Sequence, residues 1–192
     1  MGRLTYLCGA IMLLMLMSGT AWSQEAFQAY ARKDYADAYK GFEKLAASGD
    51  LNAMNNLGLM LLNGQGTVVN YAAAADWFEK AAEKGHLNAI TNLGTLYELG
   101  HGRPQNYQKA AQLYRSAADR GTSDAQYNLA QLYEQGNGVA KDPMQAYVWY
   151  SLAARSGDPD AKQAQQKIKS TLPQNLVGSA DAFVKNWKPM TN

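Results

Sequence analysis

The chain has 192 residues, of which 47% are apolar, a composition that suits one folded domain of modest size. Its 18 basic and 16 acidic residues nearly balance, which argues against the strongly basic surface that attracts nucleic acids or anionic membranes. The single cysteine, Cys8, excludes an intrachain disulfide and a cysteine-based zinc site.

The first 23 residues have the pattern of a secretory signal peptide. Arg3 supplies a positive charge, an apolar run extends from about Tyr6 to Met17, and small residues precede Ser23. The alternative is an uncleaved membrane anchor, but the run is shorter than the roughly 20 apolar residues that span a bilayer. We therefore expect cleavage after Ser23 and a cysteine-free mature protein that is periplasmic or secreted.

A repeat of 36 residues organises the rest of the chain. The segment at 52–58, Asn-Ala-Met-Asn-Asn-Leu-Gly, returns with few changes at 88–94 and at 124–130. The second half of the unit, Trp-Phe-Glu-Lys-Ala-Ala at 77–82, recurs at 113–118 and 149–154. A fixed period of this size is typical of stacked repeat arrays.

Apolar residues at helical spacing predict two antiparallel helices in each unit. A lead-in helix is expected within residues 24–34, at about 25–32, and the repeat array within 35–170. The expected first helices are 51–63, 87–99 and 123–135, and the expected second helices are 36–48, 72–84, 108–120 and 144–156. A degenerate helix at 159–170 follows, and a last amphipathic helix lies in a C-terminal capping segment, 171–192. No Pro/Ser-rich linker divides residues 24–190, so we expect one domain.

Recurring small and polar residues mark where these helices begin and where they approach one another. One column of N-caps contains Asp50, Thr122 and Asp158, with His86 as its weakest member, and the other contains Asp34, Asn70, Asn106 and Asp142. Ala89, Gly58 and Gly94 are expected where helices come close, against large core residues such as Phe78.

The combined pattern, A-x-x-x-L-G-x-x-Y-x-x-G-x-G followed by A-x-x-W-Y/F-x-x-A-A-x-x-G, resembles the Sel-one-like repeat, a relative of the tetratricopeptide repeat. The resemblance covers about residues 35–170, with three full copies. It implies an all-α solenoid of antiparallel helix pairs and a non-catalytic adaptor or scaffold that holds a protein or peptide. A cysteine-rich subgroup of the family is linked to β-lactam binding, but this chain lacks those cysteines.

The residue patterns do not indicate catalysis, a metal site or a cofactor. Gly64-Gln65-Gly66 and its repeats lack the preceding strand and the following Lys of a phosphate-binding loop. His86 and His101 are the only histidines, and we interpret them as solvated turn residues rather than ligands. Glu98 and Glu134 could form an acid–base pair, but we interpret them as exposed helix surface.

By resemblance to the tetratricopeptide arrangement, the first helices line the concave face, which is the usual binding surface of a solenoid. The expected outward residues are Asn52, Asn55, Leu59 and Leu62 in the first copy, Asn88, Thr91, Thr95 and Glu98 in the second, and Asp124, Tyr127, Gln131 and Glu134 in the third. Exposed leucines beside polar residues are typical of a partner surface. The alternative, that Leu59 and Leu62 pack under the lead-in helix, stays open.

The sequence therefore predicts an exported scaffold that binds a protein or peptide partner. We expect no nucleic acid partner and no stable membrane insertion of the mature chain. One alternative, suggested by resemblance, is an immunity-type inhibitor of a secreted toxic lipase. Another is a hydrolase of cell-wall fragments or β-lactams that uses Glu98 or Glu134. The oligomeric state and the partner's identity are left open.

Overall fold

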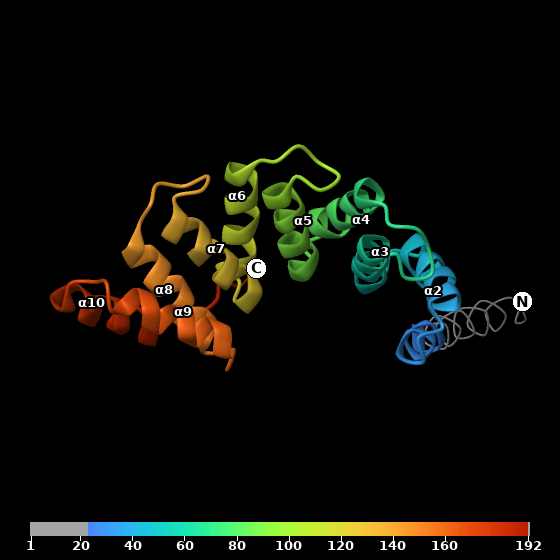
Figure 1. Cartoon of the computed structure of the whole chain (residues 1–192). Helices are drawn as coiled ribbons and strands as arrows, with labels where there is room; N and C mark the ends of the chain where they lie inside the picture. Colours follow the sequence, from blue (N-terminus) through green and yellow to red (C-terminus); the bar gives the residue numbers. More distant parts are fainter. Residues whose placement is uncertain (1–22, 192) are drawn as a thin grey trace, which may run out of the picture. The chain divides into compact units, whose positions relative to one another are not determined.

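The computed structural model describes residues 23–191, which form an all-helical array without β-strands (Figure 1). The predicted signal peptide, apart from Ser23, lies outside the described residues, as does Cys8. A helix at residues 23–31 precedes the labelled elements. These are α2 (Tyr35–Ala47), α3 (Leu51–Asn63), α4 (Tyr71–Glu83), α5 (Leu87–Leu99), α6 (Tyr107–Ala118), α7 (Ser123–Gln135), α8 (Pro143–Ala154), α9 (Pro159–Lys169) and α10 (Gln174–Asn186).

The helix bounds follow the repeat. The first helices α3, α5 and α7 begin and end where the sequence predicts, whereas the second helices begin one residue earlier than expected. Glycine ends each first helix in the left-handed conformation, as at Gly64, where φ is 64°. This conformation is costly for any residue with a β-carbon, which explains why glycine recurs there.

Most of the predicted N-caps form, but His86 caps its helix through its side chain whereas Thr122 does not. Asp50 accepts a hydrogen bond from the backbone N–H of Ala53 at 2.9 Å, as predicted. His86, expected to be the weakest cap and a solvated turn residue, accepts one from Ala89 through Nδ1 at 3.2 Å. Neither Thr122 nor Asp34, both predicted N-caps, makes a side-chain cap bond. The prediction that His86 is the weakest N-cap was wrong, because an unprotonated imidazole nitrogen is also an acceptor.

Contacts group the chain into two compact units, one up to Ala81 and one from Ala82. In the first unit, the ring of Phe27 packs edge-on against Phe42, with centroids 5.0 Å apart. Gly58 lies directly under the ring of Phe78, and a β-carbon there would lie only 2.4 Å from Phe78 Cε1. The predicted close approach of helices at Gly58 is thus confirmed.

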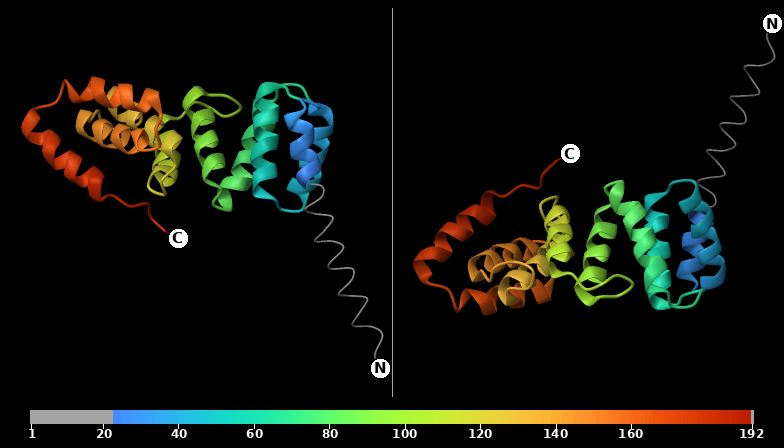
Figure 2. Two further views of the ribbon diagram at one scale, coloured as in Figure 1. Left: turned by 90° about the horizontal axis from the view of Figure 1, so that it is seen from below. Right: turned by 90° about the horizontal axis from the view of Figure 1, so that it is seen from above.

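In the second unit, α8 is buried on nearly every side, unlike its counterparts in the other copies. Val148 and Leu152 are buried, whereas α6 carries exposed Gln112 and Ser116 at the equivalent positions. The reason is that α10 packs against α8 (Figure 2). A helix that is apolar all round needs cover on each face.

Polar contacts fasten α10 and the tail that follows it. The hydroxyl of Tyr147 on α8 donates a hydrogen bond to Asp181, which also pairs with Lys169 at 3.4 Å. The tail then returns to the turn between α6 and α7, where the backbone N–H of Met190 donates to the carbonyl of Asp119 at 2.8 Å. Within residues 23–191, no helix is long and apolar enough to cross a membrane.

Candidate binding site between α7, α8 and α9

A pocket of about 590 Å³ opens between α7, α8 and α9, all in the second unit. Helix α7 contributes Tyr127, Gln131, Glu134 and Gln135, and α9 contributes Ala164 and Lys167. The remaining lining residues are Tyr150 of α8 and Lys141 of the loop before it. Three of these residues, Tyr127, Gln131 and Glu134, belong to the predicted binding face. The pocket therefore joins residues from two successive first helices and from the second helix between them.

A smaller hollow of about 400 Å³ lies between the helix at 23–31 and α2 in the first unit. Its charged side chains are solvent-exposed and pair with close neighbours, Arg32 with Asp34 at 3.0 Å and Lys40 with Asp37 at 4.0 Å. Exposed local pairs of this kind are ordinary surface features. We place the candidate site at the α7–α9 pocket because partly buried polar groups converge there.

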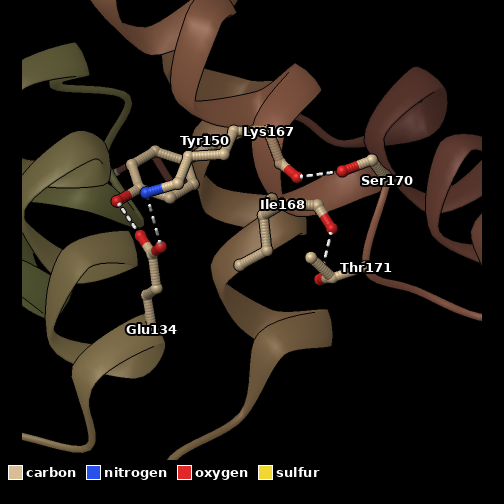
Figure 3. A network of polar contacts seen from close by, with 6 residues as sticks. All are labelled: Glu134, Tyr150, Lys167, Ile168, Ser170 and Thr171. Atoms are coloured by element: carbon tan, nitrogen blue, oxygen red, sulfur yellow. Dashed lines mark hydrogen bonds and ion pairs between the residues drawn. The ribbon is translucent and has the colours of Figure 1, made fainter.

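The carboxylate of Glu134, which lines this pocket, contacts two further lining residues, Tyr150 and Lys167 (Figure 3). The hydroxyl of Tyr150 donates to its Oε2 at 2.8 Å, and Nζ of Lys167 lies 3.8 Å from its Oε1. Tyr150 is buried, and the side chain of Lys167 is 79% exposed. Glu134 is thus held on one side by a fixed donor and on the other by a cation that solvent surrounds.

The same pair occurs one repeat earlier, where Tyr114 donates to Oε2 of Glu98 at 2.6 Å. The Tyr114 oxygen also lies 3.0 Å from Oγ1 of Thr95, and the side chain of Asn128 is near enough to lower the pKa of the phenol. The interpretation of Glu98 and Glu134 as exposed surface was therefore wrong. Both are partly buried acceptors, because each contacts a phenol on the following helix.

Burial raises the pKa of both phenols well above the ordinary 10.0, and a carboxylate acceptor beside each raises it further. Tyr114 and Tyr150 are therefore hydrogen-bond donors at every physiological pH. The carboxylates of Glu98 and Glu134 accept these bonds, which are stronger than bonds between neutral groups.

The pocket opens where a repeated asparagine is missing. Asn56, Asn92 and Asn128 occupy one column of the repeat, and Ala164 takes this column in α9. The Asn128 side chain acts on the Tyr114 phenol of the preceding helix, whereas Ala164 has no polar side-chain atom to offer Tyr150. The smaller side chain accounts for the space beside Tyr150.

Tyr127 forms one wall of the pocket. Its ring packs edge-on against Tyr150, with centroids 5.3 Å apart. Burial raises the pKa of Tyr127, and the carboxylates of Asp160, Asp158 and Glu134 contribute to the increase. This wall of the pocket is therefore aromatic with acidic residues around it.

The other residues of the predicted binding face differ in their solvent exposure. Asn55 and Thr91, expected to point outward, are only 7% and 5% exposed, and Thr91 Oγ1 donates to the carbonyl of Leu87 at 3.0 Å. The column they share with Tyr127 is thus largely buried, because it faces the neighbouring helix. Exposed positions are Asn52, Asn88 and Asp124, and partly buried ones are Leu59, Leu62 and Thr95.

Sequence reasoning missed the residues that α8, α9 and the loop before α8 contribute, namely Lys141, Tyr150, Ala164 and Lys167, and also Gln135 of α7. Tyr150 packs in the core, and its hydroxyl donates to Glu134. The signal that could have found the pocket is the change from Asn to Ala164 in an otherwise constant column. Among the described residues, no group of three or more His, Cys, Asp or Glu side chains is placed to hold a metal ion.

Comparison with known proteins supports the architecture. The chain resembles a solved structure from uropathogenic Escherichia coli, a protective antigen with an SLR fold, at 30% identity and a TM-score of 0.73; the match covers 79% of this chain and 32% of that one. A Sel1 repeat protein from Oxalobacter formigenes matches at 38% identity and a TM-score of 0.59, over 66% of this chain and 95% of the other.

A third structure, an immunity protein from Pseudomonas aeruginosa, has 18% identity and a TM-score of 0.39 over 90% of this chain and 85% of its own, too weak a likeness to support an argument. No curated protein matches the chain. The model of the Sel1 repeat matches residues 51–86, 87–122 and 123–158, which together make up more than half of the sequence. The chain therefore belongs to the Sel1 repeat family.

Proposed function

We propose that this protein is an exported scaffold that binds a protein or peptide through its first helices, with the α7–α9 pocket as the main contact. Sel1 repeat proteins are typically interaction scaffolds and are generally non-catalytic. The observation that carries the proposal is the pocket itself, in which three residues of the predicted binding face converge with Tyr150 and Lys167.

The contacts of Glu134 favour binding over acid–base catalysis. One carboxylate oxygen accepts the Tyr150 hydrogen bond and the other faces Lys167. Tyr150 keeps its proton, because burial raises its pKa, and is therefore a fixed donor to Glu134 rather than a proton-transfer partner. A carboxylate held by such a donor is suited to orient polar groups of a partner.

Export is part of this proposal and rests on the pattern of residues 1–23. Fractionation of cells that express the protein, followed by determination of the N-terminus of the purified product, tests it. A periplasmic or secreted product that begins at Gln24 supports export. A product that retains Met1 in the cytoplasmic fraction argues against it.

Partner binding is tested by crosslinking in intact cells, affinity purification and mass spectrometry. We compare the unaltered protein with a Tyr127→Ala/Gln131→Ala variant and with Phe183→Ala, which alters an exposed aromatic residue on α10. We expect one dominant partner, recovered at least fivefold less with the double variant and equally well with Phe183→Ala. Equal recovery with all three proteins would reject the pocket as the contact, and no enriched partner would reject the scaffold function.

A further inference from the structure

We propose that the α7–α9 pocket binds an arginine side chain of the partner, which takes the place beside Glu134 that Lys167 occupies in the free protein. This inference rests on the proposed function, because it specifies the chemistry of the partner. It follows from the ion pair, the aromatic wall and the space that the pocket provides.

The ion pair shows that a cation fits at this point and that the resident one can leave. Lys167 Nζ lies 3.8 Å from Glu134 Oε1, which exceeds ordinary hydrogen-bond length. Its side chain is 79% exposed, whereas that of Glu134 is 34% exposed. An ion pair this exposed contributes little to stability, so Lys167 can move into solvent at small cost.

The aromatic wall favours arginine over lysine. A guanidinium group is planar, stacks on aromatic rings and donates two parallel hydrogen bonds to a carboxylate. The chain already holds one of its own guanidinium groups against an aromatic ring, with a phenol hydroxyl as the acceptor. Arg115 lies with its guanidinium carbon 4.8 Å from the ring centroid of Trp149 and donates a hydrogen bond to the hydroxyl of Tyr133. Tyr127 beside Glu134 offers the same combination of ring and acceptor.

The charges around the pocket also favour a cation at its Tyr127 wall. Asp158 and Asp160, at the start of α9, act with Glu134 on the Tyr127 phenol. The basic residues that line the pocket are Lys141 and Lys167. When Lys167 moves into solvent, Glu134 loses its ion-pair partner, and a guanidinium restores the neutral pair.

The space for this group comes from Ala164. The column in which Ala164 stands carries asparagine in the three preceding copies. The pocket volume of about 590 Å³ is larger than an arginine side chain needs. A partner can thus place its guanidinium beside Glu134 while neighbouring backbone lies along the pocket rim.

The experiment is a titration of the purified protein with the peptide Ac-Gly-Arg-Gly-NH₂, followed by NMR chemical shifts. The matched control replaces arginine by citrulline, which keeps the shape and removes the charge. We expect the arginine peptide to bind at least tenfold more tightly than the citrulline peptide, with shift changes centred on Tyr127 and Tyr150. Lys167→Ala should strengthen binding about threefold, because the competing cation is gone.

Glu134→Gln is the decisive variant. Its amide oxygen still accepts the Tyr150 hydrogen bond, so the fold is kept, and an unchanged circular dichroism spectrum checks this. We expect at least a tenfold loss of arginine-peptide binding. Equal binding of both peptides, or unchanged binding by Glu134→Gln, would overturn the inference.

The crosslinking experiment separates this inference from the proposed function. A partner lost with Tyr127→Ala/Gln131→Ala but fully retained with Glu134→Gln would leave the scaffold function standing and overturn the arginine site. Failure to capture any partner would reject the function, while the peptide titration would still decide whether the pocket recognises a guanidinium.

Discussion

The hydroxyl of Tyr150 donates to Glu134 across 2.8 Å, and the equivalent pair one repeat earlier, Tyr114 and Glu98, is joined across 2.6 Å. In the first copy the same two columns carry Leu62 and Phe78. The acid and the phenol are thus present together or absent together. The reason is that a buried hydroxyl or carboxylate without its partner is costly, whereas an apolar pair at the same place is not.

Tyr114→Phe is expected to destabilise the protein, because it removes the hydroxyl that donates to Glu98 and lies within hydrogen-bond distance of Thr95 Oγ1. We expect a loss of about 1–3 kcal/mol in the free energy of unfolding. The double variant Glu98→Leu/Tyr114→Phe, which copies the first repeat, should recover most of this loss. Urea unfolding of the four proteins in this double-mutant cycle gives the coupling energy. Additive effects of the two substitutions would contradict the pairing.

Stability should fall in alkaline solution above about pH 10. Burial, reinforced by a neighbouring glutamate, raises the pKa of Tyr114 and Tyr150 from the ordinary 10.0. Because the unfolded chain loses these protons first, the contribution is complete below the unfolded pKa and is lost above it, by about 1.4 kcal/mol per pH unit for each phenol.

Denaturant unfolding between pH 9 and pH 11 measures this slope, and phenolate absorbance reports the ionisation. The Glu98→Leu/Tyr114→Phe variant serves as the control, because it lacks one of the two phenols that donate to a glutamate. Its slope above pH 10 should be smaller than that of the unaltered protein by about 1.4 kcal/mol per pH unit. A flat stability profile up to pH 11 would be inconsistent with the buried state of the phenols.

Two glycine-to-alanine substitutions should have opposite effects. At Gly58, the new β-carbon would lie 2.4 Å from the Phe78 ring, and we expect a net loss of about 1–3 kcal/mol through overpacking. At Gly178 in α10, the new β-carbon would meet no atom within 4 Å apart from its chain neighbours and the nearby backbone of its own helix. There the better helix propensity of alanine should add about 0.5–1 kcal/mol. Thermal unfolding of both variants measures these changes in stability. Equal changes at Gly58 and Gly178 would contradict the prediction.

Removal of residues 172–192 should make the protein self-associate, because α8 loses the helix that covers it. Val148 and Leu152 would then be uncovered, and exposed apolar patches promote association. Sedimentation velocity compares the truncated and full chains. Val148→Gln with Leu152→Ser, which copies Gln112 and Ser116 of α6, should restore the behaviour of the full chain. A truncated chain that does not associate would show that α10 is dispensable as a cover.

The sequence by itself determined the helices and their order. The 36-residue period, the N-caps such as Asp50 and the glycines such as Gly64 act within a few residues of chain, so their effects can be read locally. The same local pattern identified the repeat family and three residues of the pocket. The sequence also contains evidence of the contact between Glu98 and Tyr114. These two residues are replaced together, by Leu62 and Phe78, in the first copy.

Only the tertiary structure decided which polar residues are buried and where the pocket lies. Thr91 and Glu98 sit on helix faces that the sequence marks as polar, but packing against the next helix buries the first and partly buries the second. Glu134 meets Tyr150 and Lys167 because three helices converge, with Ala164 leaving the space between them. Such distances depend on how helices stack on one another, which periodicity within a single helix does not specify.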